Sequence, residues 1–148
     1  MYGGVSRELP HENIFKEGES MTNSKAKGKA GELEFARLCR SMGYEVRRTA
    51  QYCGKTGDAA DCVGLPGIHI EVKRVEHLNI DDALDQARRD AEAKQDGSLP
   101  IVAHRRNNTR WKITMDAADW FELFREWEAG RSKAMEPKKD RLTMERGA

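Results

Sequence analysis

The segment Ile68–Lys73 constrains the fold of this chain more than any other stretch. Its even-numbered residues are apolar and its odd-numbered residues are polar, which is the pattern of a β-strand with one buried face. The polar row consists of His69, Glu71 and Lys73, so a carboxylate and an ammonium stand side by side on one face. The segment therefore predicts a strand with one apolar face that packs in the core and one polar face whose side chains can take part in chemistry.

A second carboxylate precedes this strand in the sequence. Asp61 begins the apolar stretch Cys62–Leu65, which predicts another strand, and Pro66-Gly67 predicts the turn between the two. Such a hairpin can bring Asp61 to Glu71 and Lys73. Two carboxylates and one amine that lie close together can bind a divalent cation and activate a water molecule. Phosphodiester cleavage needs both.

The turn itself limits this hypothesis. A strict two-residue turn would pair Cys62 with Glu71 and place Asp61 on the opposite face. Pro-Gly favours a type II turn, which suits two-residue hairpins poorly. We therefore expect a longer loop or a β-bulge that brings Asp61 round to Glu71.

Composition narrows the class of protein. The chain has 148 residues, enough for one domain with a real core, with 38% hydrophobic and 34% charged residues. No stretch is long and apolar enough to span a bilayer, and no secretory signal is evident at the start. Three cysteines without zinc-like spacing predict reduced thiols in a cytoplasmic protein. The net charge of +1 neither indicates nor excludes a nucleic-acid partner.

Apolar periodicity and turn residues predict one folded domain over residues 24–130 between two mobile arms, 1–23 and 131–148. We expect helices near 29–42, 79–95 and 116–130, and strands near 44–48, 60–65, 68–75, 99–105 and 111–115. This order predicts an α/β fold with helices on the faces of a central sheet.

Several side chains have two interpretations on pattern alone. Glu32 lies against the apolar stripe of the first helix, either as a first-turn acid or as a carboxylate aimed at the sheet, while Glu34 faces out. The loop 49–57 carries residues that suit phosphate contacts, but such a composition is more often that of an ordinary solvated loop. Trp120 and Trp127 favour core or dimer contacts over base stacking.

The ordered set of Glu32, Asp61 and Glu71-Val72-Lys73 resembles the motif of the PD-(D/E)xK nuclease superfamily. Lys27-Gly28, Gly43-Tyr44, Arg48-Thr49-Ala50 and the run from Gly67 to Glu76 narrow the resemblance to archaeal-type Holliday junction resolvases, in the branch carried by phages and prophages. The similarity covers roughly residues 25–124. It implies a restriction-endonuclease-like core with a central, mixed five-stranded sheet flanked by helices.

The resemblance also implies residue roles. Asp61, Glu71 and the Val72 carbonyl would bind Mg²⁺ or Mn²⁺, and Glu32 would complete that metal site. Lys73 would orient the attacking water, and Asp58 is a rival to Asp61 for its position. DNA contacts would come from basic and polar residues along the chain: Lys27, Lys29, Arg47, Arg48, Thr49, Lys55, Arg74, Gln86, Arg105 and Arg106.

The function implied is a Mg²⁺-dependent endonuclease that resolves Holliday junctions or other branched DNA. Two symmetric cuts imply a homodimer, with no membrane and no small-molecule cofactor involved. Departures from the archaeal pattern at Leu33 and in the loop 49–57 concern substrate preference. The alternatives are a related phage nuclease that cuts flaps, single strands or duplex, and a DNA-binding module without activity.

Overall fold

The structure is a computed structural model that describes residues 17–49 and 60–135. In chain order its elements are α1 (Glu17–Ser41), β1 (Arg47–Arg48), β2 (Cys62–Val63), β3 (Ile68–Arg74), α2 (Ile80–Lys94), β4 (Leu99–Arg105), β5 (Lys112–Thr114) and α3 (Ala117–Met135).

The five strands form one mixed sheet in the order β1-β2-β3-β4-β5. β3 and β4 are parallel, with Glu71 beside Val102 and Lys73 beside His104, whereas the other neighbouring strands are antiparallel. The connection between the parallel strands runs through α2, as a crossover of this kind requires. The expected α/β fold, with a central mixed five-stranded sheet flanked by helices, is confirmed.

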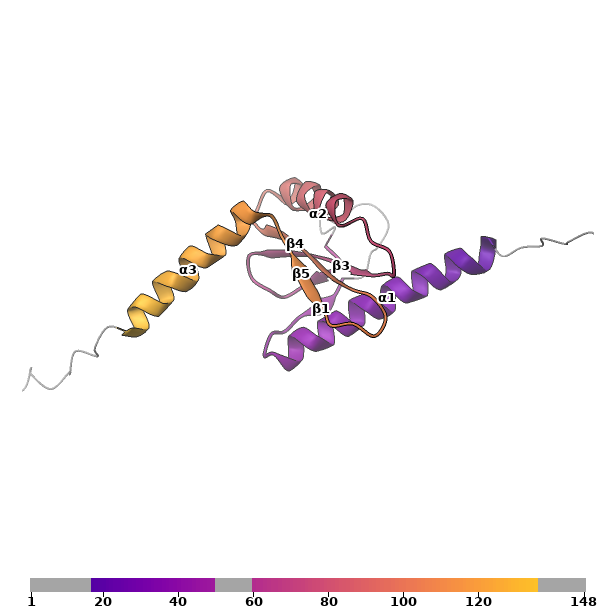
Figure 1. Ribbon diagram of the computed structural model, residues 1–148, viewed down its shortest axis with the longest axis horizontal. Helices are drawn as coiled ribbons and strands as arrows, with labels where there is room; N and C mark the ends of the chain where they lie inside the picture. Colours follow the sequence, from indigo (N-terminus) through magenta and orange to yellow (C-terminus); the bar gives the residue numbers. More distant parts are fainter. Residues whose placement is uncertain (1–16, 50–59, 136–148) are drawn as a thin grey trace, which may run out of the picture.

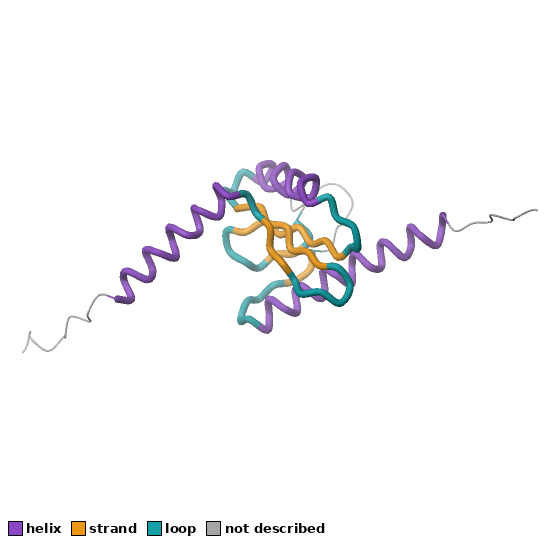
Figure 2. Tube along the Cα trace, viewed as in Figure 1, coloured by secondary structure: helices purple, strands orange, loops and turns teal. Residues whose placement is uncertain are grey.

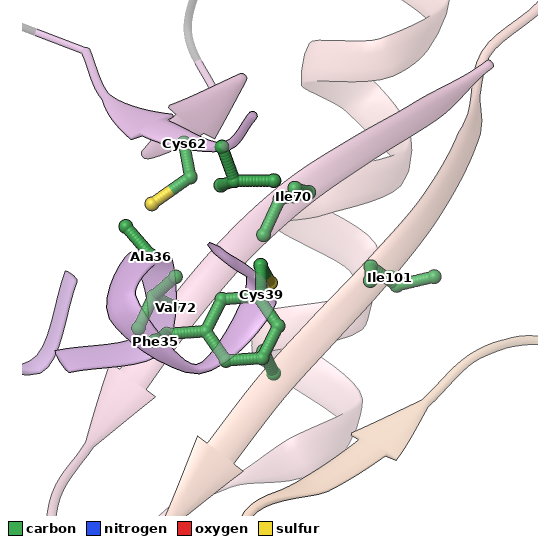
Figure 3. Packing of buried hydrophobic residues seen from close by; sticks show 9 residues of the cluster. Phe35, Ala36, Cys39, Cys62, Ile70, Val72 and Ile101 are labelled. Atoms are coloured by element: carbon green, nitrogen blue, oxygen red, sulfur yellow. The ribbon is translucent and has the colours of Figure 1, made fainter. Parts of the chain in front are cut away.

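α1 covers one face of the sheet (Figure 1). Phe35 and Cys39 of this helix pack against Ile70 and Val72 of β3 (Figure 3), and Ile70 is fully buried. Burying a side chain of that size stabilises the fold by about 1.5–3 kcal/mol. Gly31 permits this close approach, since a Cβ there would lie 2.8 Å from the Cβ of Arg74.

α2 covers the other face. Asn79 caps it as predicted, because its side chain accepts the Asp82 N–H at 3.2 Å. Leu84 and Ala87 then pack against Val102 of β4. Small residues on the buried face of α2 bring it close to the sheet, next to the polar row of β3.

The first helix is longer than predicted. We expected it to begin near residue 29, but α1 begins at Glu17, so residues 17–23 of the expected arm are helical. The sequence hides this extension because its apolar period starts only at Phe35 and residues 17–28 contain weak helix formers such as Gly18 and Gly28. An established helix nevertheless extends at much lower cost than a new helix forms. Residues 1–16 lie outside the described part of the chain.

The last helix also passes its predicted end. α3 continues through Gly130 to Met135, because one glycine costs a helix only about 1 kcal/mol and residues 131–135 include good helix formers. It projects away from the sheet (Figure 2), and none of its residues is buried. Trp120 and Trp127 are 47% and 53% exposed, which excludes the core role considered for them in this chain. The rest of the expected C-terminal arm, 136–148, is not described.

Candidate functional site

The acid–amine pair of β3 faces α2. Glu71 lies beside Val102, which packs against that helix, and alternation along the strand puts His69 and Lys73 on the same face. Glu71 is 2% exposed although it is ionisable. Its Oε1 lies 2.7 Å from Lys73 Nζ, so the ammonium offsets part of the buried charge.

A β-bulge brings Asp61 to this pair. Cys62 pairs with Ile70, and the carbonyl of Ile70 also accepts the Asp61 N–H at 2.9 Å, so two residues of one strand oppose one of the other. At the turn, the Leu65 carbonyl accepts the Ile68 N–H at 3.1 Å, and Gly67 has the positive φ of 77° that a type II turn requires. The predicted departure from a regular two-residue hairpin is confirmed.

Asp61 is held firmly in place. It is 6% exposed, and its Oδ2 accepts the Val72 N–H at 2.8 Å. Its own carbonyl accepts the Thr49 N–H at 3.0 Å, which ties the end of β1 to the same point. Because the N–H and C=O of one strand residue point the same way, the Val72 carbonyl is directed towards the strand edge where Asp61 lies.

The carboxyl groups repel one another electrostatically. Burial raises the pKa of Asp61, and the nearby Glu32 charge adds to that rise. Burial is also the main cause of the raised pKa of Glu71, and the charges of Asp61 and Asp90 raise it further. Lys73 lowers both pKa values but does not cancel the other causes. The cluster therefore gains from an added positive charge.

The donor set fits a hard divalent cation. Glu71 Oε2 is buried and has no hydrogen-bond partner within residues 17–49 and 60–135. A buried carboxylate oxygen without a partner costs free energy, and cation binding would offset that cost. Asp61, Glu71 and the Val72 carbonyl offer only oxygen atoms, the ligands that Mg²⁺ prefers.

Glu32 approaches Asp61 from a different element. It belongs to α1, on the opposite side of the sheet from α2, and its Oε2 pairs with Arg48 Nε. Its backbone carbonyl also accepts the Cys62 thiol at 3.6 Å. The charge of Glu32 also adds to the rise in the pKa of Asp61, and its place in the metal site stays a prediction of the resemblance.

Two residues near Glu71 had no role in the sequence analysis. His69 of β3 and Asp90 of α2 each offer a ligand atom to a group with Glu71 in which all atoms lie within 4.8 Å. The signal for His69 was its place in the polar row of β3. Asp90 follows Gln86 by one helical turn, but only the packing of α2 on the sheet brings it to Glu71.

Two of the arginines expected at DNA have structural partners. Glu34 binds Arg105 at 2.6 Å and Arg74 at 3.5 Å, and it accepts the Trp111 indole N–H at 3.1 Å. Arg105 also lies over the ring of Trp111, 5.7 Å from its centroid. The expectation that Glu34 faces solvent is wrong, because α1 turns this residue towards the ends of β3 and β4 and their arginines.

The remaining predicted DNA contacts differ in placement. Thr49 donates its hydroxyl to the Ala60 carbonyl, and Arg48 is held by Glu32. Lys27 is half-buried on α1, and the other side chains in the described ranges are exposed: Lys29, Arg47, Gln86 and Arg106. Lys55 and the rival Asp58 fall in 50–59, outside the described residues.

A groove with several basic residues in its lining lies at the ends of β3 and β4. It has a volume of about 790 Å³ and includes His104, which lies beside Lys73 in the sheet. Arg106 and Lys112 add positive charge to its lining, and Asn79 at the start of α2 forms another part of the wall. Burial and the Lys112 charge lower the pKa of His104, so its imidazole contributes little positive charge at neutral pH.

Comparison with known proteins adds a distant structural likeness. No family model matches the chain, and no curated protein matches its sequence. Among solved structures, Hjc of Archaeoglobus fulgidus, a Holliday junction resolvase from an archaeal hyperthermophile, is 21% identical, with 58% of this chain and 74% of that chain covered. Its TM-score of 0.46 is too low to decide what this chain binds or cuts. No helix in the described ranges is long and apolar enough to cross a membrane.

Proposed function

We propose that this chain is a metal-dependent DNA endonuclease that hydrolyses phosphodiester bonds in Holliday junctions or other branched DNA. The observation that carries the proposal is the convergence of Asp61, Glu71 and Lys73. Their spacing in the sequence resembles the PD-(D/E)xK motif, and the bulge brings the two acids into electrostatic contact beside the lysine.

Each residue has a chemical task in this proposal. Asp61, Glu71 and the Val72 carbonyl would hold Mg²⁺ or Mn²⁺, which supplies a more acidic water and neutralises phosphate charge. Lys73 keeps its ammonium beside Glu71, where it stabilises the negative charge that grows on the phosphate in the transition state. Glu32 holds Arg48 next to Asp61 and so sets the charge balance at the far side of the cluster.

The basic groove is the proposed DNA path. Its lining residue His104 lies beside Lys73 in the sheet, and Arg106 and Lys112 along the same groove can contact successive phosphates. We assign no sequence reading to this surface, because lysine and arginine contacts to phosphate position a duplex without specifying bases. This favours recognition of DNA shape, as a branched substrate demands.

A homodimer completes the proposal. Two symmetric cuts in a four-way junction need two active sites related by a twofold axis. α3 offers a surface for such pairing, since Trp120, Phe124 and Trp127 follow one another along it with ring centroids 5.2 and 5.3 Å apart while the helix buries none of its residues. We place the enzyme in the cytoplasm, where junctions arise, and a phage-borne origin remains an expectation of the resemblance alone.

Cleavage of matched substrates tests the activity. Labelled four-way junction, flap, single-stranded and duplex DNA are incubated with the protein and Mg²⁺ or Mn²⁺, and binding is measured separately in EDTA. Asp61→Asn and Lys73→Ala should each lower the cleavage rate about a hundredfold or more while DNA binding persists. Lys94→Ala, which removes a lysine paired with Asp96 at the end of α2, should cut as the wild type does.

The outcomes separate the alternatives. Preferential cutting of flap or duplex would indicate a related DNA-processing nuclease. Binding without cutting of any substrate would indicate a DNA-binding module whose acids are structural. Wild-type cutting by Asp61→Asn or Lys73→Ala would remove that residue from the mechanism.

A further inference from the structure

Glu71 has neighbours that the proposed nuclease site does not use. His69 lies on the same face of β3 and is 1% exposed, and Asp90 approaches from α2. One ligand atom from each of His69, Glu71 and Asp90 lies within 4.8 Å of the others. Two ligands of one cation can be about 4.2 Å apart when each bond is about 2.1 Å, so small side-chain adjustments would let all three bind one ion.

Charge and burial point to a cation at this place. One carboxylate oxygen of Asp90 lies within 4.8 Å of one carboxylate oxygen of Glu71. Glu71 Oε1 binds Lys73, but Oε2 is buried and has no hydrogen-bond partner in the described ranges of the chain. This oxygen is therefore available to a group of two acids and one imidazole as well as to the all-oxygen set at Asp61.

We propose that His69, Glu71 and Asp90 form a second cation site, with one nitrogen and two oxygen ligands, that shares Glu71 with the site at Asp61. The imidazole changes the metal preference. Mg²⁺ favours oxygen ligands, whereas imidazole suits first-row transition metals. The second site therefore takes Mn²⁺, Fe²⁺ or Zn²⁺ in preference to Mg²⁺, and two cations bound about 3.5–4 Å apart are an arrangement known in phosphodiester hydrolysis.

Manganese binding in the absence of DNA tests this inference independently of nuclease activity. The full chain is titrated with Mn²⁺, free metal is measured by electron paramagnetic resonance, and pulsed measurements detect nitrogen bound to Mn²⁺. The wild type should show a nitrogen coupling and two equivalents of bound metal. His69→Gln should lose the coupling and one equivalent, whereas His104→Gln, on the neighbouring strand, should keep both.

Asp90→Asn provides a second test that does not alter the buried ring. This substitution should raise the dissociation constant of one bound Mn²⁺ about tenfold or more. Asp81 is an exposed acid on the same helix, and Asp81→Asn should leave both dissociation constants unchanged. Asp61→Asn should keep the nitrogen coupling while losing cleavage. Absence of the coupling in the wild type, its persistence in His69→Gln, or wild-type affinity in Asp90→Asn would each overturn the second site. A coupling without any DNA cleavage would overturn the nuclease proposal alone.

Discussion

Asp61 and Glu71 are two acids whose ionisation the protein makes harder. Burial is the main cause of the raised pKa of each, and the charge of a neighbouring carboxylate adds to it. An enzyme can tolerate this cost at its metal site because the cation that restores the balance is part of its function.

Stability should therefore depend on pH through Asp61. A raised pKa means that the folded state binds the proton more tightly than the unfolded chain, so stability falls as pH rises above the ordinary carboxyl pKa of about 4. We expect the free energy of unfolding of the wild type, relative to Asp61→Asn, to decrease between about pH 4 and pH 7 without metal. Urea denaturation across this range measures it.

Metal addition supplies the control for that experiment. Mn²⁺ at neutral pH should stabilise the wild type against urea more than Asp61→Asn, because the metal binds the ionised carboxylates of the folded state. A relative stability that rises with pH would contradict the assigned direction of the shift.

Two neighbouring arginines should respond differently to substitution. Arg105 binds Glu34 and covers Trp111, so Arg105→Ala should lower the free energy of unfolding by about 1.5–3 kcal/mol. Arg106 is exposed in the basic groove, so Arg106→Ala should leave the free energy of unfolding unchanged. It should reduce the slope of log binding constant against log salt concentration by about 1, the value for one lost phosphate contact. Thermal unfolding and binding at several salt concentrations measure these effects, and loss of stability in Arg106→Ala would reverse the assignment.

At the scale of elements, the β2–β3 hairpin positions the first carboxylate. Gly64 has φ of 123°, and a Cβ there would lie 2.2 Å from the Glu45 carbonyl oxygen. This close approach fastens the hairpin to the segment before β1. The bulge and the adjoining glycine turn together set the register on which Asp61 depends.

Gly64→Ala should consequently disturb the site as well as the fold. We expect a loss of about 1–3 kcal/mol or more in the free energy of unfolding, because the backbone conformation disfavours any side chain and the added methyl meets backbone atoms. Cleavage should fall with it. Gly130→Ala is the matched control, since it sits in open space within α3 and should leave stability equal or slightly higher. Equal stability of Gly64→Ala and wild type would show that the hairpin accommodates a Cβ.

At the scale of the whole molecule, the distinctive feature is α3, a helix with an apolar stripe of which no residue is buried. Its aromatic rings contact one another along the helix, and it is anchored at its start by the bond from Arg88 Nε to Asp116 at 3.1 Å. An exposed apolar stripe of this size favours association with another surface.

The oligomeric state should therefore depend on this stripe. Wild-type protein should have the mass of a dimer in light scattering, and Trp120→Ala combined with Trp127→Ala should have that of a monomer with an intact fold. Tyr44→Ala, an exposed aromatic away from α3, should remain dimeric. A dimer in the double variant would place the twofold axis elsewhere, and a wild-type monomer at cleavage concentrations would remove α3 pairing from the proposal.

Local sequence patterns were enough to predict the β3 strand with its acid–amine pair, the irregular hairpin before it, the cap of α2 and the order of helices and strands. These follow from local rules, because alternation, turn residues and capping side chains act within a few positions of the chain. The same rules predicted too late a start for α1 and too early an end for α3, because a helix can continue beyond the residues that it buries.

Which charged side chains become neighbours depends on how the helices pack against the sheet. Asp90 reaches Glu71 because α2 lies across the sheet, and Glu34 gathers Arg74 and Arg105 because α1 covers the other face. These pairs are far apart in the sequence, and periodicity assigns a side chain to a face without naming its neighbour there. The neighbour is set by helix packing against the sheet, and with it the electrostatic balance on which the proposed metal site depends.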